Sequence, residues 1–346
     1  MNILRGSATL LLLICNQALY NKALAEDEAA SHERAVKVVA EQRLAVGNAG
    51  MLPLYVSRDW SMRQPSITRA VVVLHGRLRN ANVYYHSALA AHAVAGNAGK
   101  ATIMIVPQFL AQVDIERWHL PPDMLRWSLE GWEGGEPALG PSPASSFDAL
   151  DAILARLTDR NIFPNLKQVV VAGHSGGGQV VQRYAIATQG EGALTSAHIG
   201  VRYVVANPSS YAYFSVERPE PQIAASCPGY NDWKYGIEAR PPYLAAPTPA
   251  ELEQRYVARQ VIYLLGTADT NPDHPALDKS CMAEAQGPYR YVRGHSYAAT
   301  MAKRDGGTPN QRVWDVQGVG HDGDKMLTSR CGLAALFDLP GCGAGH

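Results

Sequence analysis

A serine in this chain stands in a setting that suits a nucleophile. The stretch Gly173-His174-Ser175-Gly176-Gly177 follows a short β-branched run, residues 169–171, and precedes residues 178–186, whose apolar side chains recur at helical spacing. A G-x-S-x-G sequence at a strand-to-helix junction forms a sharp turn that projects the serine hydroxyl above a sheet. Glycines suit such a turn, because a Cβ would collide with the neighbouring strand or helix. The pattern predicts that Ser175 is a nucleophile.

Such a serine needs a base to remove its proton and a third group to orient that base. His321 is the predicted base, because Gly318 and Gly320 come shortly before it and Asp322 can cap a helix that follows it. The alternative is that His321 is an ordinary surface histidine. Asp269 is the predicted third group, which gives the chain order Ser, Asp, His.

Asp269 has two competitors nearby, Asp273 and Asp278. Asp269 is preferred because it lies three residues beyond Gly266, where an apolar run ends. The same acidic residues, with His274 among them, could suggest a metal site. Their spacing is less regular than that of oxygen-ligand metal sites, so we predict no metal.

Short apolar runs recur along the chain and alternate with segments of helical character. The predicted strands are residues 70–74, 101–106, 169–171, 201–206, 260–265 and 312–316. The predicted helices include 82–95, 145–157 and 178–186, with others around Cys281, Tyr297 and Met326. Two further apolar runs flank Gly47-Asn48-Ala49-Gly50 and predict antiparallel edge strands. This alternation predicts an α/β fold with a mostly parallel central sheet and helices on both faces.

Parallel sheets bind ligands at the carboxyl ends of their strands. His75, Ser175, Asp269 and His321 each follow a predicted strand, so we expect all four at that edge. His75 and His174 are neighbours of these motifs and are candidates for the substrate pocket. The alternative is that both histidines only pack or donate hydrogen bonds.

Two segments lack clear periodicity and are expected to flank the site. Residues 108–143 form a long loop with Trp127 and Trp132, which either line a substrate pocket or pack the loop. Residues 208–258 form a lid-like excursion, in which the roles of its aromatic residues stay open. These are Tyr211, Tyr213 and Trp233.

Four segments together resemble the α/β-hydrolase superfamily, over residues 36–338. They are Leu74-His75-Gly76, Gly173-His174-Ser175-Gly176-Gly177, Gly266-Thr267-Ala268-Asp269 and Gly318-Val319-Gly320-His321-Asp322. The resemblance implies a Ser–Asp–His triad and an oxyanion hole formed by the backbone N–H groups of Gly176 and Arg77. It implies no cofactor. The side chains of Arg77 and Arg79 either meet a substrate carboxylate or are solvated loop cations.

The N-terminus has the features of a secretory signal peptide. Arg5 precedes an apolar run, residues 8–15, and Ala23-Leu24-Ala25 is a small-residue cleavage site. The run is too short to cross a bilayer. Cys15 could indicate lipid anchoring, but Ile14 stands where a small residue is usual. We expect a signal peptide at 1–25, one domain at 26–346, and export to the periplasm or the medium.

Removal of the signal peptide leaves an even number of cysteines in an oxidising compartment. The favoured pairs are Cys227–Cys281 and Cys331–Cys342, since the second pair is close in sequence. Free buried thiols are the alternative. A Cys₄ zinc site is disfavoured, because no C-x₂-C spacing occurs.

The charge balance gives no reason to expect nucleic acid or an anionic membrane as a partner. The chain has 31 basic and 31 acidic residues, and the basic Arg5 and Lys22 both lie in the predicted signal peptide.

The resemblance to the α/β-hydrolase superfamily, whose commonest substrates are esters, implies an exported serine hydrolase acting on a small-molecule or polymeric ester. Amidase, peptidase or polyester depolymerase activity, and a non-catalytic binding module, remain the alternatives. The sequence does not define the oligomeric state.

Overall fold

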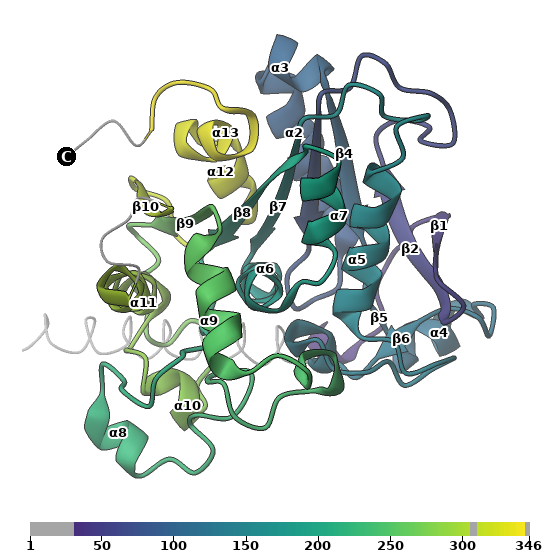
Figure 1. Ribbon diagram of the computed structural model, residues 1–346. Coiled ribbons are helices and arrows are strands. Elements are labelled where there is room, and N and C mark those ends of the chain that lie inside the picture. Colours follow the sequence, from purple (N-terminus) through teal and green to yellow (C-terminus); the bar gives the residue numbers. More distant parts are fainter. Residues whose placement is uncertain (1–30, 305–309, 343–346) are drawn as a thin grey trace, which may run out of the picture.

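A computed structural model describes residues 31–304 and 310–342, so the predicted signal peptide lies outside the described residues. An eight-stranded sheet forms its centre (Figure 1). The strands are β1 (Gln42–Val46), β2 (Gly50–Val56), β3 (Arg69–Leu74), β4 (Thr102–Pro107), β7 (Gln168–His174), β8 (Gly200–Ala206), β9 (Val261–Gly266) and β10 (Gln311–Val316).

The sheet is parallel except at one edge. Its strand order is β1-β2-β4-β3-β7-β8-β9-β10, and only the β1–β2 and β2–β4 pairs are antiparallel. In the parallel part, Val72 of β3 lies opposite Ile105 of β4 and Val171 of β7. The predicted hairpin is confirmed as β1 and β2, with β1 at the edge and β2 one strand inside it.

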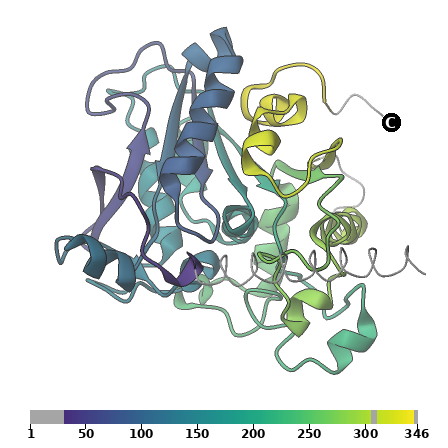
Figure 2. The same cartoon turned by 180° about the vertical axis from the view of Figure 1, so that it is seen from behind.

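Helices cover both faces of the sheet (Figures 1 and 2). One face is covered by α2 (Ala81–Val94), α3 (Asn97–Lys100), α12 (Gly323–Thr328) and α13 (Arg330–Phe337). The other is covered by α5 (Ser146–Leu157), α6 (Gly176–Ala187), α7 (Glu191–Ser196), α9 (Pro249–Ala258) and α11 (Arg290–Arg304). The predicted α/β class with a mostly parallel sheet is confirmed.

Successive side chains of the central strands point to opposite faces of the sheet and so form two hydrophobic cores. In β3, Val71 and Val73 belong to the core beneath α2, whereas Val72 and Leu74 belong to the core on the opposite face. A strand buried on both faces needs an unbroken apolar run, which is the pattern that predicted these strands.

Residues 108–143 contain more regular structure than a loop. They include β5 (Leu110–Ala111), which pairs in parallel with β6 (Arg126–Trp127), together with α4 (Gln112–Trp118) and the 3₁₀ helix η1 (Gly131–Gly134). These elements are too short to give a periodic pattern in the sequence. The segment therefore has a defined shape built from several brief elements.

Of the two roles that the sequence leaves open for Trp127 and Trp132, the structure shows packing and not the lining of a pocket. Both indoles are fully buried and pack against Phe109, with ring centroids 5.3 and 5.4 Å from the phenylalanine ring. An aromatic side chain gains most from burial of its whole surface, and these two gain it in the core.

The predicted excursion, residues 208–258, contains α8 (Pro221–Ala225), the 3₁₀ helix η2 (Pro242–Leu244) and α9. Its aromatic residues pack inward. Tyr211 stacks on Tyr297 of α11 at 4.6 Å between centroids, and Tyr213 packs edge-on against the same ring at 5.0 Å. Trp233 donates from Nε1 to the carbonyl oxygen of Gly134, which ties the excursion to η1.

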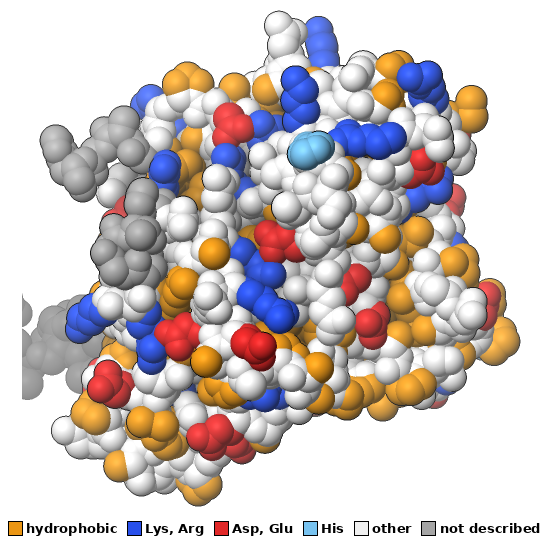
Figure 3. Space-filling model, viewed as in Figure 1, with side chains coloured by type: hydrophobic (Ala, Val, Ile, Leu, Met, Phe, Trp, Pro, Cys, Tyr) orange, Lys and Arg blue, Asp and Glu red, His pale blue; other side chains and the backbone are white. Residues whose placement is uncertain are grey.

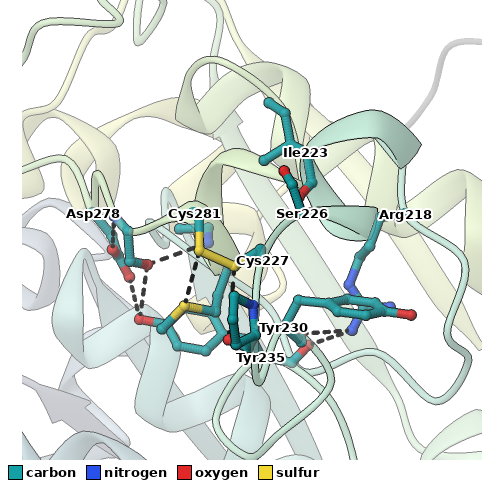
Figure 4. The surroundings of a disulfide bond; sticks show 12 residues. Arg218, Ile223, Ser226, Cys227, Tyr230, Tyr235, Asp278 and Cys281 are labelled. Carbon is teal, nitrogen blue, oxygen red and sulfur yellow. Dashed lines mark hydrogen bonds between the residues drawn. A yellow bond between two sulfur atoms is a disulfide. The ribbon is translucent and has the colours of Figure 1, made fainter.

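Two disulfides join the pairs of cysteines that the sequence favours. Cys227 is bonded to Cys281, with the Cα atoms 5.7 Å apart, and Cys331 is bonded to Cys342, with the Cα atoms 4.8 Å apart. The first bond links the loop after α8 to α10 (Cys281–Glu284), and Tyr235 and Asp278 lie beside it (Figure 4). It therefore fastens the excursion to the loop that follows β9.

On the face of the molecule shown in Figure 3, basic and acidic side chains are interspersed.

Removal of the Cys227–Cys281 bond should lower the free energy of unfolding more than removal of the other disulfide. The loop that it closes spans 54 residues against 11, and the chain-entropy relation gives losses of about 4 and about 3 kcal/mol respectively. Denaturant unfolding of Cys227→Ala/Cys281→Ala and Cys331→Ala/Cys342→Ala would measure both losses. Equal stability of the first variant and the wild type would contradict this expectation.

Candidate active site

Ser175 occupies the turn between β7 and α6 in a conformation that L-residues rarely adopt. Its backbone φ is +60° and its ψ is −123°, a strained pair that costs of order 1–3 kcal/mol. Two close approaches explain the flanking glycines: a Cβ on Gly173 would lie 2.3 Å from the carbonyl oxygen of Gly177, and one on Gly177 would lie 2.3 Å from that of Leu74. The packing of β3, β7 and α6 therefore fixes the position of the serine.

The structure brings Ser175, His321 and Asp269 into one chain of hydrogen bonds. Nε2 of His321 lies 2.9 Å from Oγ of Ser175, and Nδ1 of His321 lies 2.8 Å from Oδ2 of Asp269. This geometry lets Nδ1–H donate to the carboxylate and leaves Nε2 free to accept the serine proton. All three side chains are almost completely withdrawn from solvent.

The two competing aspartates lie elsewhere. Asp273 is exposed, and Asp278 accepts hydrogen bonds from the hydroxyl of Tyr235 and the backbone N–H of Ser280.

Arg290, at the start of α11, is a site residue that the sequence does not reveal. Its fully buried guanidinium has Nη1 3.5 Å from Oδ1 of Asp269 and donates from Nε to Oγ of Ser209 at 3.0 Å. The carboxylate of Asp269 thus lies between an imidazole on one oxygen and a guanidinium on the other. No motif surrounds this arginine, which lies 21 residues from Asp269.

Burial and the guanidinium of Arg290 shift the pKa of Asp269 in opposite directions, whereas they shift the pKa of His321 in the same direction. Burial raises the pKa of Asp269, and the positive charge of Arg290 opposes this rise. Burial holds the pKa of His321 well below its usual 6.5, and Arg290 and His274 lower it further. The imidazole is therefore neutral near pH 7, as a general base must be.

Asn207 holds together the loops that carry the acid and the base. Its Oδ1 accepts from the backbone N–H of Gly266 at 2.8 Å, and its Nδ2 donates to the carbonyl oxygen of Gly320 at 3.3 Å. Asn207 directly follows β8 and has a positive φ of 43°, which asparagine tolerates better than most residues. One buried amide therefore sets the separation between the segments before Asp269 and His321.

The two residues expected to form an oxyanion hole, Gly176 and Arg77, lie close together. A Cβ placed on Gly176 would come within 2.9 Å of the backbone nitrogen of Arg77. Gly176 is the first residue of α6, so its N–H has no partner within the helix. The backbone nitrogen of Arg77 and the N-terminus of α6 are therefore neighbours beside Ser175.

The neighbouring histidines differ in their placement. His75 is fully buried between Trp132 and Phe109 and accepts from the backbone N–H of Phe109 at 3.0 Å, so it has the packing and hydrogen-bonding role and not the place in the pocket. Its ring packs in the aromatic core and fixes the loop that carries Arg77. The ring centroid of His174 lies 4.5 Å from that of His321, and the ring centroid of His274 lies 5.0 Å from it.

The two arginines of the loop after β3 also differ in their surroundings. Arg79 is fully buried in an ion pair with Asp114 at 2.8 Å, so its side chain does not face a substrate. Arg77 is half-buried and borders the space on both sides of Ser175.

Two clefts meet at Ser175. The first, about 260 Å³, is lined by Leu78, Tyr84, His174, His321 and Asp322. The second, about 410 Å³, is lined by Glu133, Gln179, Lys234, Tyr235 and Asp278. A larger cavity of about 590 Å³ between α7 and α9 contains none of the predicted site residues. An extended substrate could therefore lie across the serine with one end in each cleft.

In the described part of the chain, no group of three or more His, Cys, Asp and Glu side chains is placed to hold a metal ion. Residues 31–304 and 310–342 also contain no helix long and apolar enough to cross a membrane.

No protein-family model matches this sequence, and a search of curated proteins also finds no match. Solved structures, by contrast, are similar in fold. LpqC, a poly(3-hydroxybutyrate) depolymerase from Bordetella parapertussis, matches with a TM-score of 0.59 at 24% identity, over 85% of this chain and 86% of the depolymerase. Poly(aspartic acid) hydrolase-1 from Sphingomonas sp. KT-1 matches with a TM-score of 0.59 at 20% identity, over 85% of this chain and 96% of the hydrolase.

The sheet order, the turn at Ser175 and these similarities define the class: the chain has the α/β-hydrolase fold. The fold that the four sequence segments suggested is confirmed.

Replacement of Arg290 by Met should move the acidic limb of the kcat/KM profile to higher pH. Arg290 lowers the pKa values of both His321 and Asp269, so its loss should raise both. The wild-type limb should lie below pH 6.5, since the imidazole is neutral above its lowered pKa. A pH series of ester hydrolysis would measure the shift.

Arg304→Met provides the matched control, because Arg304 lies at the far end of the same helix and pairs with Glu253 at the surface. Its profile should coincide with that of the wild type. An Arg290→Met profile with the wild-type limb would contradict the electrostatic role of Arg290.

Proposed function

We propose that this protein is an exported serine hydrolase that cleaves a carboxylic ester through an acyl-serine intermediate. The observation that carries the proposal is the hydrogen-bonded series from Ser175 through His321 to Asp269 at 2.9 and 2.8 Å. A binding module has no use for such an arrangement, whereas a nucleophilic serine requires it.

In the proposed reaction, Oγ of Ser175 attacks the ester carbonyl carbon while Nε2 of His321 takes the hydroxyl proton. The N–H groups of Gly176 and Arg77 hold the negative oxygen of the tetrahedral intermediate, and each such donor is typically worth about 10²–10³ in turnover. The intermediate collapses when His321 returns the proton to the leaving alcohol. Water then attacks the acyl-serine by the same route and regenerates the hydroxyl.

A polymeric ester is the second candidate substrate. Ser175 lines both clefts, so each of them can receive one side of a chain that is cleaved at this serine. One structure similar in fold is described as a poly(3-hydroxybutyrate) depolymerase and another as a poly(aspartic acid) hydrolase. The first substrate is a polyester and the second a polyamide, so polymer cleavage and amide cleavage both belong in the test.

A fluorophosphonate probe should label the wild-type protein on Ser175, because the probe reacts with activated serines. Ser175→Ala should abolish labelling and reduce ester hydrolysis by at least about 10³-fold, since the attacking atom is missing. Ser209→Ala is a matched control in the same cleft and should still be labelled. An unlabelled wild-type protein would favour the binding module instead.

Nitrophenyl esters, matching anilides, short peptides and soluble oligoesters should separate the substrate classes. The proposal predicts hydrolysis of the esters at rates well above those of the anilides and peptides. Faster turnover of oligoesters than of monomeric esters would favour the depolymerase. Activity confined to amides would overturn the ester assignment.

Export is the part of the proposal supported by the N-terminal sequence pattern and by two disulfides, which are typical of exported proteins. The mature protein recovered from the producing cells should begin at Glu26. N-terminal sequencing and intact mass would measure this, and a protein that retains residues 1–25 would contradict it.

A further inference from the structure

A buried carboxylate lies beside the space that the proposed oxyanion hole encloses. A Cβ placed on Gly176, which would lie 2.9 Å from the backbone nitrogen of Arg77, would also lie 2.8 Å from Oε1 of Glu133. Glu133 is 4% exposed and belongs to η1, which packs against α6. No motif in the sequence points to this residue.

The contacts of Glu133 fix one oxygen and leave the other directed at the cleft. Oε2 lies 3.4 Å from both Nε2 of Gln179 and Nζ of Lys234. The amide of Gln179 is oriented by Arg183 and Ser210, which donate to its oxygen at 2.9 and 2.7 Å and so turn its nitrogen toward Glu133. Among the described residues, no donor is bonded to Oε1 of Glu133.

The position of His321 decides which half of a substrate meets Glu133. The imidazole must pass its proton to the leaving oxygen, so the leaving group lies on the side of His321. His321 lines the 260 Å³ cleft and not the 410 Å³ cleft. The acyl group therefore enters the 410 Å³ cleft, which we call the acyl cleft, with Glu133 beside the carbonyl carbon.

A purely aliphatic acyl group is poorly matched to this environment. The acyl cleft presents the charged groups of Glu133, Lys234 and Asp278, and a hydrocarbon chain there would displace their water without offering hydrogen bonds. A negative oxygen near the developing oxyanion also opposes the reaction, unless a donor of the substrate lies between them.

We infer that the acyl cleft selects short acyl groups that carry a hydrogen-bond donor one or two carbons from the carbonyl carbon, with Oε1 of Glu133 as the acceptor. The donor is a hydroxyl or an ammonium group, which share this chemistry. This inference rests on the proposed ester hydrolysis and specifies its substrate class.

Nitrophenyl esters of butyrate, 3-hydroxybutyrate and 3-aminobutyrate differ only in the donor and provide the test. The kcat/KM of each is divided by its rate constant for hydroxide-catalysed hydrolysis, which removes differences in intrinsic reactivity. The wild-type protein should favour the hydroxy or the amino ester over butyrate by about 10-fold or more, as expected for one hydrogen bond to a charged acceptor. The better of the two identifies the donor. Equal or faster turnover of butyrate would overturn the inference.

Two variants of Glu133 assign the preference to its carboxylate. Glu133→Gln keeps the size of the side chain and should reduce the preference, whereas Glu133→Leu should abolish it. Glu136→Gln makes the matched change on an exposed carboxylate of the same loop and should retain the full preference. A preference that survives in Glu133→Leu would contradict the assignment to Glu133.

Different results would refute the proposed hydrolase activity and the proposed selectivity of the acyl cleft. Absence of fluorophosphonate labelling and of all ester turnover would refute the hydrolase itself. Labelling and turnover with a preference for butyrate would leave the hydrolase intact and refute the donor-selective cleft. The wild-type substrate series gives this answer even if the Glu133 variants fail to fold.

Discussion

The buried carboxylate of Asp269 is the group on which the remaining geometry depends. A carboxylate that is withdrawn from water is costly unless partners replace its hydration. Here Oδ2 faces Nδ1 of His321 at 2.8 Å, and Oδ1 faces the guanidinium of Arg290 at 3.5 Å. The first contact fixes the tautomer and orientation of the imidazole. The second keeps the acid charged in a place where burial alone would favour its protonated form.

The sheet delivers these groups to one place because parallel strands end at the same edge. Ser175 follows β7, Asn207 follows β8 and Asp269 follows β9, three adjacent strands. His321 arrives from the loop after β10, and Asn207 ties that loop to the end of β9. Helix α11 supplies Arg290 from the side. Residues that are far apart in sequence therefore lie close together because the strand order and the lengths of the loops place them at the same edge of the sheet.

The sequence predicted the parts of the site that have local signatures. Ser175 lies in a turn whose glycines are required by close backbone contacts. Asp269 follows a buried strand with an unbroken apolar run, and His321 follows a short loop that contains Gly318 and Gly320. Arg290 and Glu133 carry no such signature. Each reaches the site from a helix or a 3₁₀ turn whose position depends on tertiary packing, and an arginine or glutamate in a polar segment resembles any surface residue.

The roles of Trp127 and Trp132 could not be decided from the sequence, since a tryptophan-rich loop suits a pocket and a core equally well until its neighbours are known.

The hydrogen bond between His321 and Asp269 can be observed directly, because an Nδ1 proton shared with a carboxylate resonates far downfield in the proton NMR spectrum. The account predicts one such resonance in the wild-type protein, its loss in Asp269→Ala and its retention in Asp273→Ala. A wild-type spectrum without it, or one in which it survives in Asp269→Ala, would contradict the account.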